Sequence, residues 1–177
     1  MTTETNDANS SDGTVEQIGD LTVLKFARRY SNSIEDVWDA ITNPERIALW
    51  WLPLDADITL DLVAGGDYVL SGPNGMPTLE WTVVDVEAPR LFAHTQGDPG
   101  SVITWTLSQD GDGCFLVLTQ TLPDRENAIN NNFIVGTHVS LDRLGALLAG
   151  APIDWDWDDF ATYQRRYAQA GLATAPQ

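Results

Sequence analysis

The sequence predicts an α+β domain in which a strongly curved antiparallel sheet of seven strands wraps around one long helix near the C-terminus. Alternation of apolar and polar residues recurs through the middle of the chain, and turn residues separate one run from the next. After Pro123 the period becomes helical for about eighteen residues. Strands joined by short turns pair antiparallel, and the apolar face of their sheet needs a partner, which the long helix supplies.

The chain begins with a polar segment that leads into the first strand. Residues 1–18 carry Ser, Thr, Asn, Asp and Glu with few apolar side chains, too few to offset the entropy of ordering. We therefore expect a disordered acidic leader there. From Leu21 to Tyr30 apolar residues such as Leu24 and Phe26 alternate with polar ones, which predicts a half-buried strand.

Two short helices are predicted after this strand. Ser33 can cap the first helix, acidic residues follow in its first turn, and apolar residues recur at helical spacing as far as Ile41. Pro44 marks the end of that helix and the start of the second, which reaches Trp51.

Six further strands are expected in the middle of the chain. Gly65-Gly66 and the run Asp110-Gly111-Asp112-Gly113 are typical hairpin turns between them. The strands lie at about residues 57–62, 68–70, 79–83, a run ending near 94, 102–108 and 114–122.

The long helix is predicted from a stripe of residues that begins at Ile134 and includes His138, Leu141 and Leu148. Gly150 and Pro152 stop it. The last segment opens with four Asp residues, favourable at a helix start, and continues with an aromatic face. The expected segments are the leader over 1–18, the domain over 19–150, a helical extension packed on it over 151–170 and a flexible tail over 171–177.

Charge excludes two classes of partner. Nine Lys and Arg stand against 26 Asp and Glu, which gives a net charge of −17. Binding to nucleic acid or to anionic lipid surfaces needs a clustered basic field, so neither is expected. The start has no signal-peptide pattern and no window is long and apolar enough to insert into a membrane, which favours a cytoplasmic location.

Seven pieces of the chain, in order, resemble the activator of heat-shock-protein-90 ATPase homologue family of the START-like, SRPBCC superfamily. The likeness covers about residues 21 to 150, and the family commonly has Trp where this chain has Thr137. It implies the helix-grip fold, with a cavity between sheet and long helix, but no single activity. The pieces are Phe26-Ala27-Arg28-Arg29, residues 34–46 with Trp50-Trp51, Gly65-Gly66-Asp67-Tyr68, Pro89-Arg90-Leu91, Trp105-Thr106-Leu107, residues 110–113 and residues 136–144.

No metal, cofactor or catalytic group is expected from the motifs. An EF-hand over Asp154 to Arg165 fails because Asp159 replaces the required Gly and Arg165 replaces the bidentate Glu. Two histidines and Cys114, far apart in sequence, make a poor zinc set. Cys114 is predicted to be a small core residue. It is the only cysteine of the sequence, which excludes an intrachain disulfide.

The expected ligand site is the cavity between sheet and long helix. His138 shares the inward stripe of the helix and could act there as a hydrogen-bond donor or a base, although a structural histidine fits the same pattern. The aromatic residues could equally belong to the core. The candidate lining consists of Trp51, Tyr68, Trp81, His94, Trp105, Gln120, Phe133, Ile134, His138 and Leu141.

Three functions remain open from the sequence. The first is a carrier or sensor that binds a small hydrophobic or amphipathic molecule in the cavity. The second, which the family name implies, is a chaperone partner that stimulates the heat-shock-protein-90 ATPase. The resemblance implies that the eukaryotic activators contact the chaperone through a further N-terminal domain. This chain is expected to have only the one domain. The third is an enzyme like the superfamily's polyketide cyclases and aromatases, with His138, Tyr68 or Gln120 as the polar group.

Overall fold

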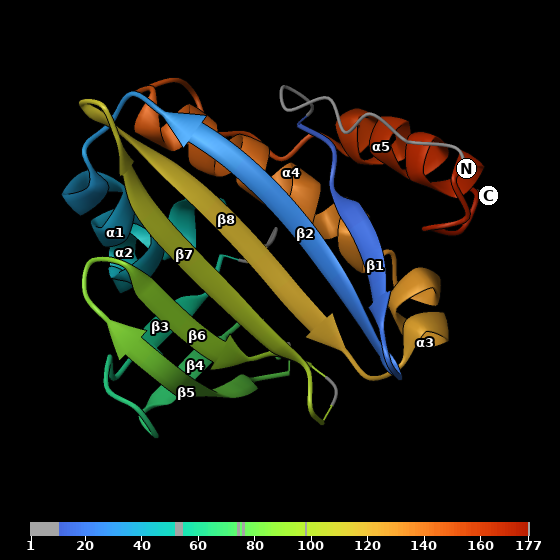
Figure 1. Cartoon of the computed structure of the whole chain (residues 1–177), viewed down its shortest axis with the longest axis horizontal. Coiled ribbons are helices and arrows are strands. Elements are labelled where there is room, and N and C mark those ends of the chain that lie inside the picture. Colours follow the sequence, from blue (N-terminus) through green and yellow to red (C-terminus); the bar gives the residue numbers. More distant parts are fainter. Residues whose placement is uncertain (1–10, 52–54, 74, 76, 98, 177) are drawn as a thin grey trace.

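In the described part of the chain, an eight-stranded antiparallel sheet forms the frame of the protein and five helices accompany it (Figure 1). The computed structural model describes residues 11–51, 55–73, 75, 77–97 and 99–176. The sheet order is β1-β2-β8-β7-β6-β5-β4-β3. The elements are β1 Thr14–Ile18, β2 Leu21–Tyr30, α1 Ile34–Thr42, α2 Pro44–Trp50, β3 Asp57–Leu60, β4 Asp67–Ser71, β5 Leu79–Glu87, β6 Leu91–Thr95, β7 Val102–Asp110, β8 Gly113–Leu122, α3 Arg125–Asn130, α4 Phe133–Leu148 and α5 Trp157–Gln169.

The expected α+β class, with a curved antiparallel sheet and a long C-terminal helix, is confirmed, but the sheet has one more strand than the sequence predicts. The extra strand is β1, which lies in the segment expected to be a disordered leader. It pairs antiparallel with β2 from Thr14 opposite Lys25 to Ile18 opposite Leu21. Backbone hydrogen bonds to the open edge of β2 order this polar segment, and such bonds do not depend on apolar side chains. Residues 1–10 of the leader lie outside the described residues.

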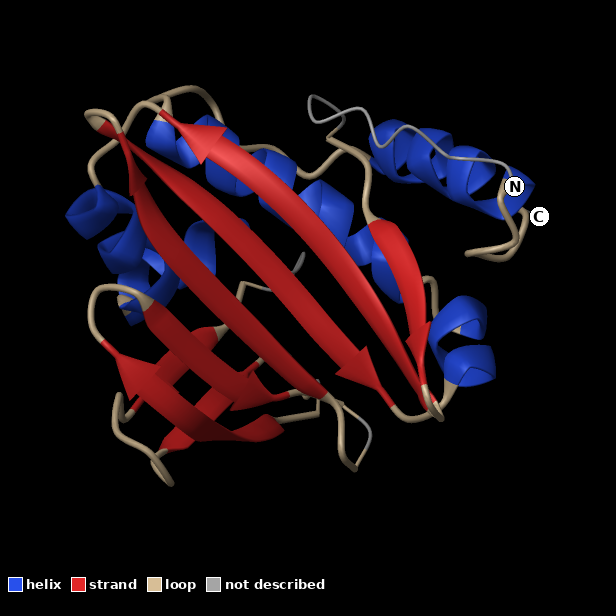
Figure 2. Cartoon of the chain, in the orientation of Figure 1, coloured by secondary structure: helices blue, strands red, loops and turns tan. Residues whose placement is uncertain are grey.

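The long strands and the long helix occupy separate layers. Figure 2 shows α4 running behind β2, whereas α3 and α5 lie to the right, beside β1 as labelled in Figure 1. The ring of Phe26 on β2 meets the ring of His138 on α4 edge to face, with centroids 5.8 Å apart. Side chains alternate between the two faces of a strand, and those of Leu116 and Leu118 in β8 point into this core, where both are fully buried.

The helices α1 and α2 position an aromatic cluster beside the sheet. Ser33 caps α1 by accepting a hydrogen bond from the Asp36 backbone N–H at 3.2 Å. The indole of Trp50 donates to the carbonyl of Ala40 at 2.9 Å, which joins α2 to α1. Trp51 follows directly and is nearly fully buried. The hydrogen bond between Trp50 and Ala40 therefore fixes the end of α2 from which Trp51 enters the core.

The C-terminal extension packs on α4 and on the N-terminal segment. Tyr163 of α5 donates to a carboxylate oxygen of Asp142 at 2.6 Å, and the hydroxyl of Tyr167 accepts from the backbone N–H of Gly13 at 2.7 Å. The prediction of a flexible tail over residues 171–177 is wrong for the residues that directly follow α5. Ala173 is buried, and the backbone N–H of Thr174 donates to the side-chain oxygen of Asn132 at 3.0 Å. Gln177 lies outside the described residues.

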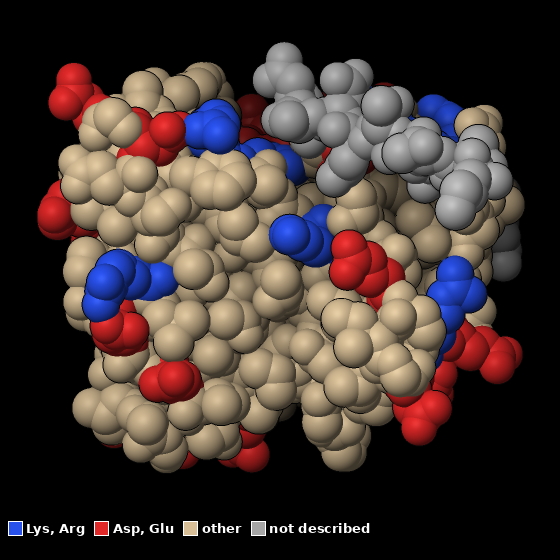
Figure 3. All heavy atoms as spheres, viewed as in Figure 1, with Lys and Arg blue, Asp and Glu red and all other residues tan. Residues whose placement is uncertain are grey.

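Charged side chains are unevenly spread over the face of the sheet that Figure 3 shows. They are sparse over its middle, where β7 and β8 run in Figure 1, and gather toward the edges. Thr and Val occupy many of the outward positions of these two strands. The negative charge is therefore concentrated in loops, helix starts and edge strands on this side of the molecule.

Candidate functional site

A cavity of about 320 Å³ lies between the sheet and α4. This volume is at the lower end of the roughly 300–1,000 Å³ of small-molecule sites. Its apolar wall consists of Trp51, Leu79, Trp81, Phe133 and Phe160. The rest of its lining is small or polar and consists of Gln96, Gly97, Gln120, Asn131, Asn132, Gly136, Thr137 and Ser140. Gly97 and Asn131 are exposed, which places the mouth at the β6–β7 loop and the junction of α3 and α4.

One stripe of α4 faces the cavity. Phe133, Gly136, Thr137 and Ser140 follow the spacing i, i+3, i+4, i+7, which brings them to one side of a helix. Successive helical residues are about 100° apart, so the stripe that holds His138 is turned away from this one by roughly a third of a circle. The helix therefore presents a small, polar stripe to the cavity and a different stripe to the core.

Four of the ten candidate residues line the cavity, and six do not. Trp51, Trp81, Gln120 and Phe133 are in its wall. The six others are fully or almost fully buried in the core outside the lining and are Tyr68, His94, Trp105, Ile134, His138 and Leu141. Their placement in the cavity wall is wrong, because hydrophobic periodicity identifies a buried face and does not distinguish packed core from cavity. A ligand-binding role of the four lining residues stays a prediction.

His94 supports the wall of the cavity from behind. Its Nδ1 lies 2.9 Å from the carbonyl oxygen of Thr95, which can only accept, so Nδ1 carries the proton. Its Nε2 then accepts a hydrogen bond from the indole of Trp105 at 3.3 Å. The ring stacks on Trp81, with centroids 5.5 Å apart and planes 19° from parallel. Burial lowers the pKa of His94 to about 4, so the ring is neutral at pH 7.

Tyr68 and Trp105 belong to the same supporting layer. Tyr68 meets Trp81 edge to face at 5.1 Å between centroids, and burial raises the pKa of its hydroxyl. Trp105 meets Trp51 edge to face at 5.7 Å. Such pairs contribute about 0.5–1.5 kcal/mol beyond area burial. These residues hold the two tryptophans of the wall in place without lining the cavity.

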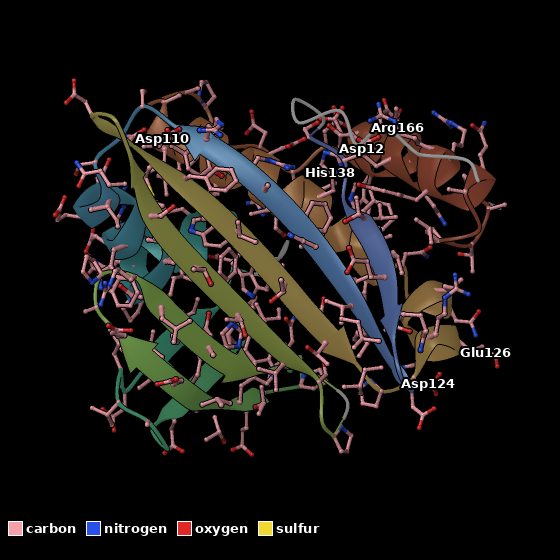
Figure 4. The ribbon with its side chains drawn as sticks, viewed as in Figure 1. Asp12, Asp110, Asp124, Glu126, His138 and Arg166 are labelled. Carbon is pink, nitrogen blue, oxygen red and sulfur yellow. The ribbon has the colours of Figure 1, made fainter. Side chains whose placement is uncertain are left out.

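His138 belongs to a separate buried cluster where α4, α5, β2 and the N-terminal segment meet. Figure 4 labels it near Asp12 and Arg166. Its ring stacks on Tyr163 with centroids 3.9 Å apart, and its Nδ1 lies 2.8 Å from the hydroxyl of Tyr167. Burial lowers the pKa of His138 to about 4, although the carboxylate of Asp142 opposes this effect. The cluster joins elements from both ends of the chain, which gives His138 a structural role.

Several polar side chains around the cavity have no hydrogen-bond partner in the part of the chain that the structure describes. Trp51 Nε1, Gln96 Oε1 and Ser140 Oγ are buried and make no hydrogen bond among the described residues. No hydrogen bond of the described residues involves the side-chain amide of Gln120 either. Each unpaired buried polar group costs roughly 1–3 kcal/mol. A ligand with polar atoms would offset part of this cost.

Of the α4 residues that line the cavity, the sequence predicts Phe133 but not Gly136, Thr137 or Ser140. Thr137 and Ser140 are the polar ones. Both are buried polar residues on a helix, and periodicity of apolar residues cannot select them. One signal was present for Thr137, because it is the position where the chain departs from the Trp of the family it resembles. A smaller residue there leaves space beside α4.

Comparison with known proteins identifies the family. The sequence profile described as activator of Hsp90 ATPase homolog 1-like protein matches residues 31–149, about two thirds of the 177 residues. The chain belongs to this family. It has the helix-grip fold that the resemblance implies. No curated protein matches the sequence.

Solved structures share the fold over nearly the whole chain. The crystal structure of CalU16 from Micromonospora echinospora is 25% identical, with a TM-score of 0.69 over 93% of this chain and 98% of that chain. The protein encoded by gene BPP1335 from Bordetella parapertussis is 24% identical, with a TM-score of 0.69 over 95% and 96%. A conserved protein of unknown function, EF2215 from Enterococcus faecalis, is 19% identical, with a TM-score of 0.69 over 92% of each chain.

Among the described residues, no three His, Cys, Asp or Glu side chains are grouped so that they could hold a metal ion. No helix in the described part of the chain has the length and apolar character to cross a membrane.

Proposed function

We propose that this protein binds a small hydrophobic or amphipathic molecule in the cavity between the sheet and α4, as a carrier or sensor. The observation that carries the proposal is the 320 Å³ cavity with aromatic walls. Ligand sites of this kind are concave, mostly apolar and supplied with a few polar groups. The family and its fold support the same reading, because the fold is one that binds ligands.

The lining favours binding over acid–base catalysis. Of the described residues in the wall, none has a side chain that titrates between pH 3 and 11, which is the range that catalytic acids and bases use. His138 and Tyr68, the candidates for an enzyme of the cyclase type, lie outside the wall. Gln120 does line it, and its amide can form hydrogen bonds but does not transfer protons at neutral pH.

A substitution of Gly136 tests directly whether ligands bind in this cavity. A Cβ atom at this position would meet nothing within 4 Å, although the residue lies within α4 and lines the cavity. The variant Gly136→Leu is therefore expected to fill the cavity and also to improve helix propensity by up to about 1 kcal/mol. It should abolish ligand binding without destabilising the fold.

Gly145 provides the matched control on the same helix. A Cβ there would make an ordinary contact at 3.8 Å with the ring of Tyr30, and the residue does not line the cavity. Hydrophobic compounds are screened by thermal shift, where a ligand that binds the folded state raises the melting temperature. Compounds should shift the wild type and Gly145→Ala but not Gly136→Leu. Equal shifts in all three proteins would place binding elsewhere, and no shift with any compound would remove the proposal.

Family membership also favours a second candidate, stimulation of the heat-shock-protein-90 ATPase. The surface feature that fits a protein partner is Trp157 at the start of α5, which is 62% exposed beside Asp158 and Asp159. An ATPase assay with purified chaperone tests it. Stimulation that Trp157→Ala reduces would support this function, and no stimulation at saturating protein would exclude it.

A further inference from the structure

Gln120 is a polar residue at a position where the sheet otherwise presents apolar side chains to the interior. It shares the inward face of β8 with Leu118 and Leu122, and the residue is 2% exposed. Directly opposite it on the neighbouring strands are Leu24 of β2 and Ile103 of β7. Paired residues of an antiparallel sheet point to the same face, so Gln120 has apolar residues on all four sides. A leucine would suit this position better for folding alone.

The amide of Gln120 has no hydrogen-bond partner among the described residues. The residue lines the cavity, and none of the hydrogen bonds among the described residues involves its amide. Trp51 Nε1 and Ser140 Oγ, also from the lining, are buried and unpartnered as well. Native proteins pair almost all of their buried polar groups. The unpaired groups around this cavity can form hydrogen bonds with a ligand that carries polar atoms.

The chemistry of these groups defines the ligand. An indole N–H can only donate, whereas the amide of Gln120 and the hydroxyl of Ser140 can both donate and accept, so the ligand needs an oxygen that accepts. None of the described lining residues is charged, and a charged ligand would lose its hydration without gaining an opposite charge. The aromatic walls suit a planar ring.

We infer that Gln120 is the specificity-determining residue of the cavity, and that it selects neutral ligands carrying a hydroxyl or carbonyl oxygen on a planar apolar frame. This inference rests on the proposed function, because it names the class of ligand for the same cavity. It goes further by separating this class from hydrocarbons, which lack the oxygen, and from carboxylates, which carry a charge.

Three probes of nearly equal shape separate these classes, namely naphthalene, 2-naphthol and 2-naphthoate. Their dissociation constants are measured at pH 7 by titration of the isotope-labelled protein, followed in proton–nitrogen correlation spectra. The wild type should bind 2-naphthol more tightly than naphthalene, and 2-naphthoate most weakly. The side-chain amide signals of Gln120 and the indole signal of Trp51 should shift with 2-naphthol.

The variant Gln120→Leu should weaken binding of 2-naphthol by about three- to tenfold, which corresponds to one neutral hydrogen bond, and leave naphthalene unchanged or tighter. Its melting temperature should be equal to that of the wild type or higher. Gln120→Met, with an unbranched side chain, repeats the test if the leucine is not accommodated. Thr121→Val, one residue away in β8 and outside the lining, is the control and should bind all probes as the wild type does.

The outcomes distinguish the inference from the proposed function. If 2-naphthol and naphthalene bind equally well and Gln120→Leu changes neither, the cavity binds ligands but Gln120 does not select them, and the inference is wrong. Tightest binding of 2-naphthoate would also overturn it. If no probe binds to the wild type, the proposed function fails for planar aromatic ligands and the inference fails with it.

Discussion

The indole Nε1 of Trp105 donates a hydrogen bond to Nε2 of His94 at 3.3 Å, in the layer directly behind the cavity wall. The other ring nitrogen of His94 donates to the carbonyl of Thr95, so both nitrogens are occupied only when the ring is neutral. Protonation would place a second N–H against the indole N–H and a charge in the core. The same ring stacks on Trp81, and its protonation state is therefore linked to the geometry of the wall.

Both histidines should make the protein less stable in mild acid. Burial lowers the pKa of His94 and of His138 to about 4, whereas an unfolded histidine titrates near 6.5. Between these pH values the unfolded chain binds more protons than the folded protein. The free energy of unfolding is therefore highest above about pH 6.5 and falls as the pH decreases toward 4. The loss is up to about 3 kcal/mol for each histidine.

Urea unfolding measured from pH 7.5 to 4 checks this prediction. His94→Phe keeps a ring against Trp81 but cannot titrate, so it should reduce the pH dependence by about half, whatever its stability at pH 7.5. A variant with the same pH dependence as the wild type would show that His94 is not titrating in this window.

We expect the hydroxyl of Tyr167 to contribute more to stability than that of Tyr163, one helical turn earlier in α5. Tyr167→Phe removes a hydroxyl that accepts from the Gly13 backbone and lies 2.8 Å from Nδ1 of His138, and it leaves both groups unpaired in the core. We expect a loss of about 1–3 kcal/mol in urea unfolding. Tyr163→Phe is the control, since it removes a bond to the partly exposed Asp142 and should cost less than about 1 kcal/mol. Equal losses would contradict the account of this cluster.

Asn132 joins the C-terminal segment to the cavity. Its backbone has φ 54°, in the left-handed region, and its side-chain oxygen accepts from both the N–H and the hydroxyl of Thr174. Asn132→Gly and Asn132→Ala lose the same side-chain bonds, but alanine also adds backbone strain of about 1 kcal/mol or more. Thermal unfolding should therefore rank the wild type above glycine and glycine above alanine. An alanine variant as stable as the glycine variant would show that the backbone changes conformation there.

Alternation of apolar and polar residues was sufficient to predict most of the strands. In β8 it places every second residue from Leu116 to Leu122 in the interior, as the structure has it. It could not predict β1, because the ordering of residues Thr14–Ile18 comes from the open edge of β2 and not from the composition of the segment. A strand that is ordered by its neighbour is visible only once the neighbour's edge is known.

The candidate site was harder to predict for a related reason. The stripe with Ile134 and His138 is buried, and burial suggested the cavity, but the cavity faces the stripe with Thr137 and Ser140. Residues that line a cavity in a helix-grip fold are selected by space and by polar atoms as well as by hydrophobicity. Gln120 was predictable because one polar residue interrupts an inward row of leucines.

The central claim is that ligands bind in the cavity between the sheet and α4. The most direct measurement is to map the binding of 2-naphthol on the assigned proton–nitrogen spectrum of the wild type. The account predicts shifts confined to the cavity, at the indole of Trp51, the amide of Gln120 and the backbone of Gly97 and Gly136. Shifts that instead centre on His138, or a spectrum that does not change at saturating 2-naphthol, would contradict it.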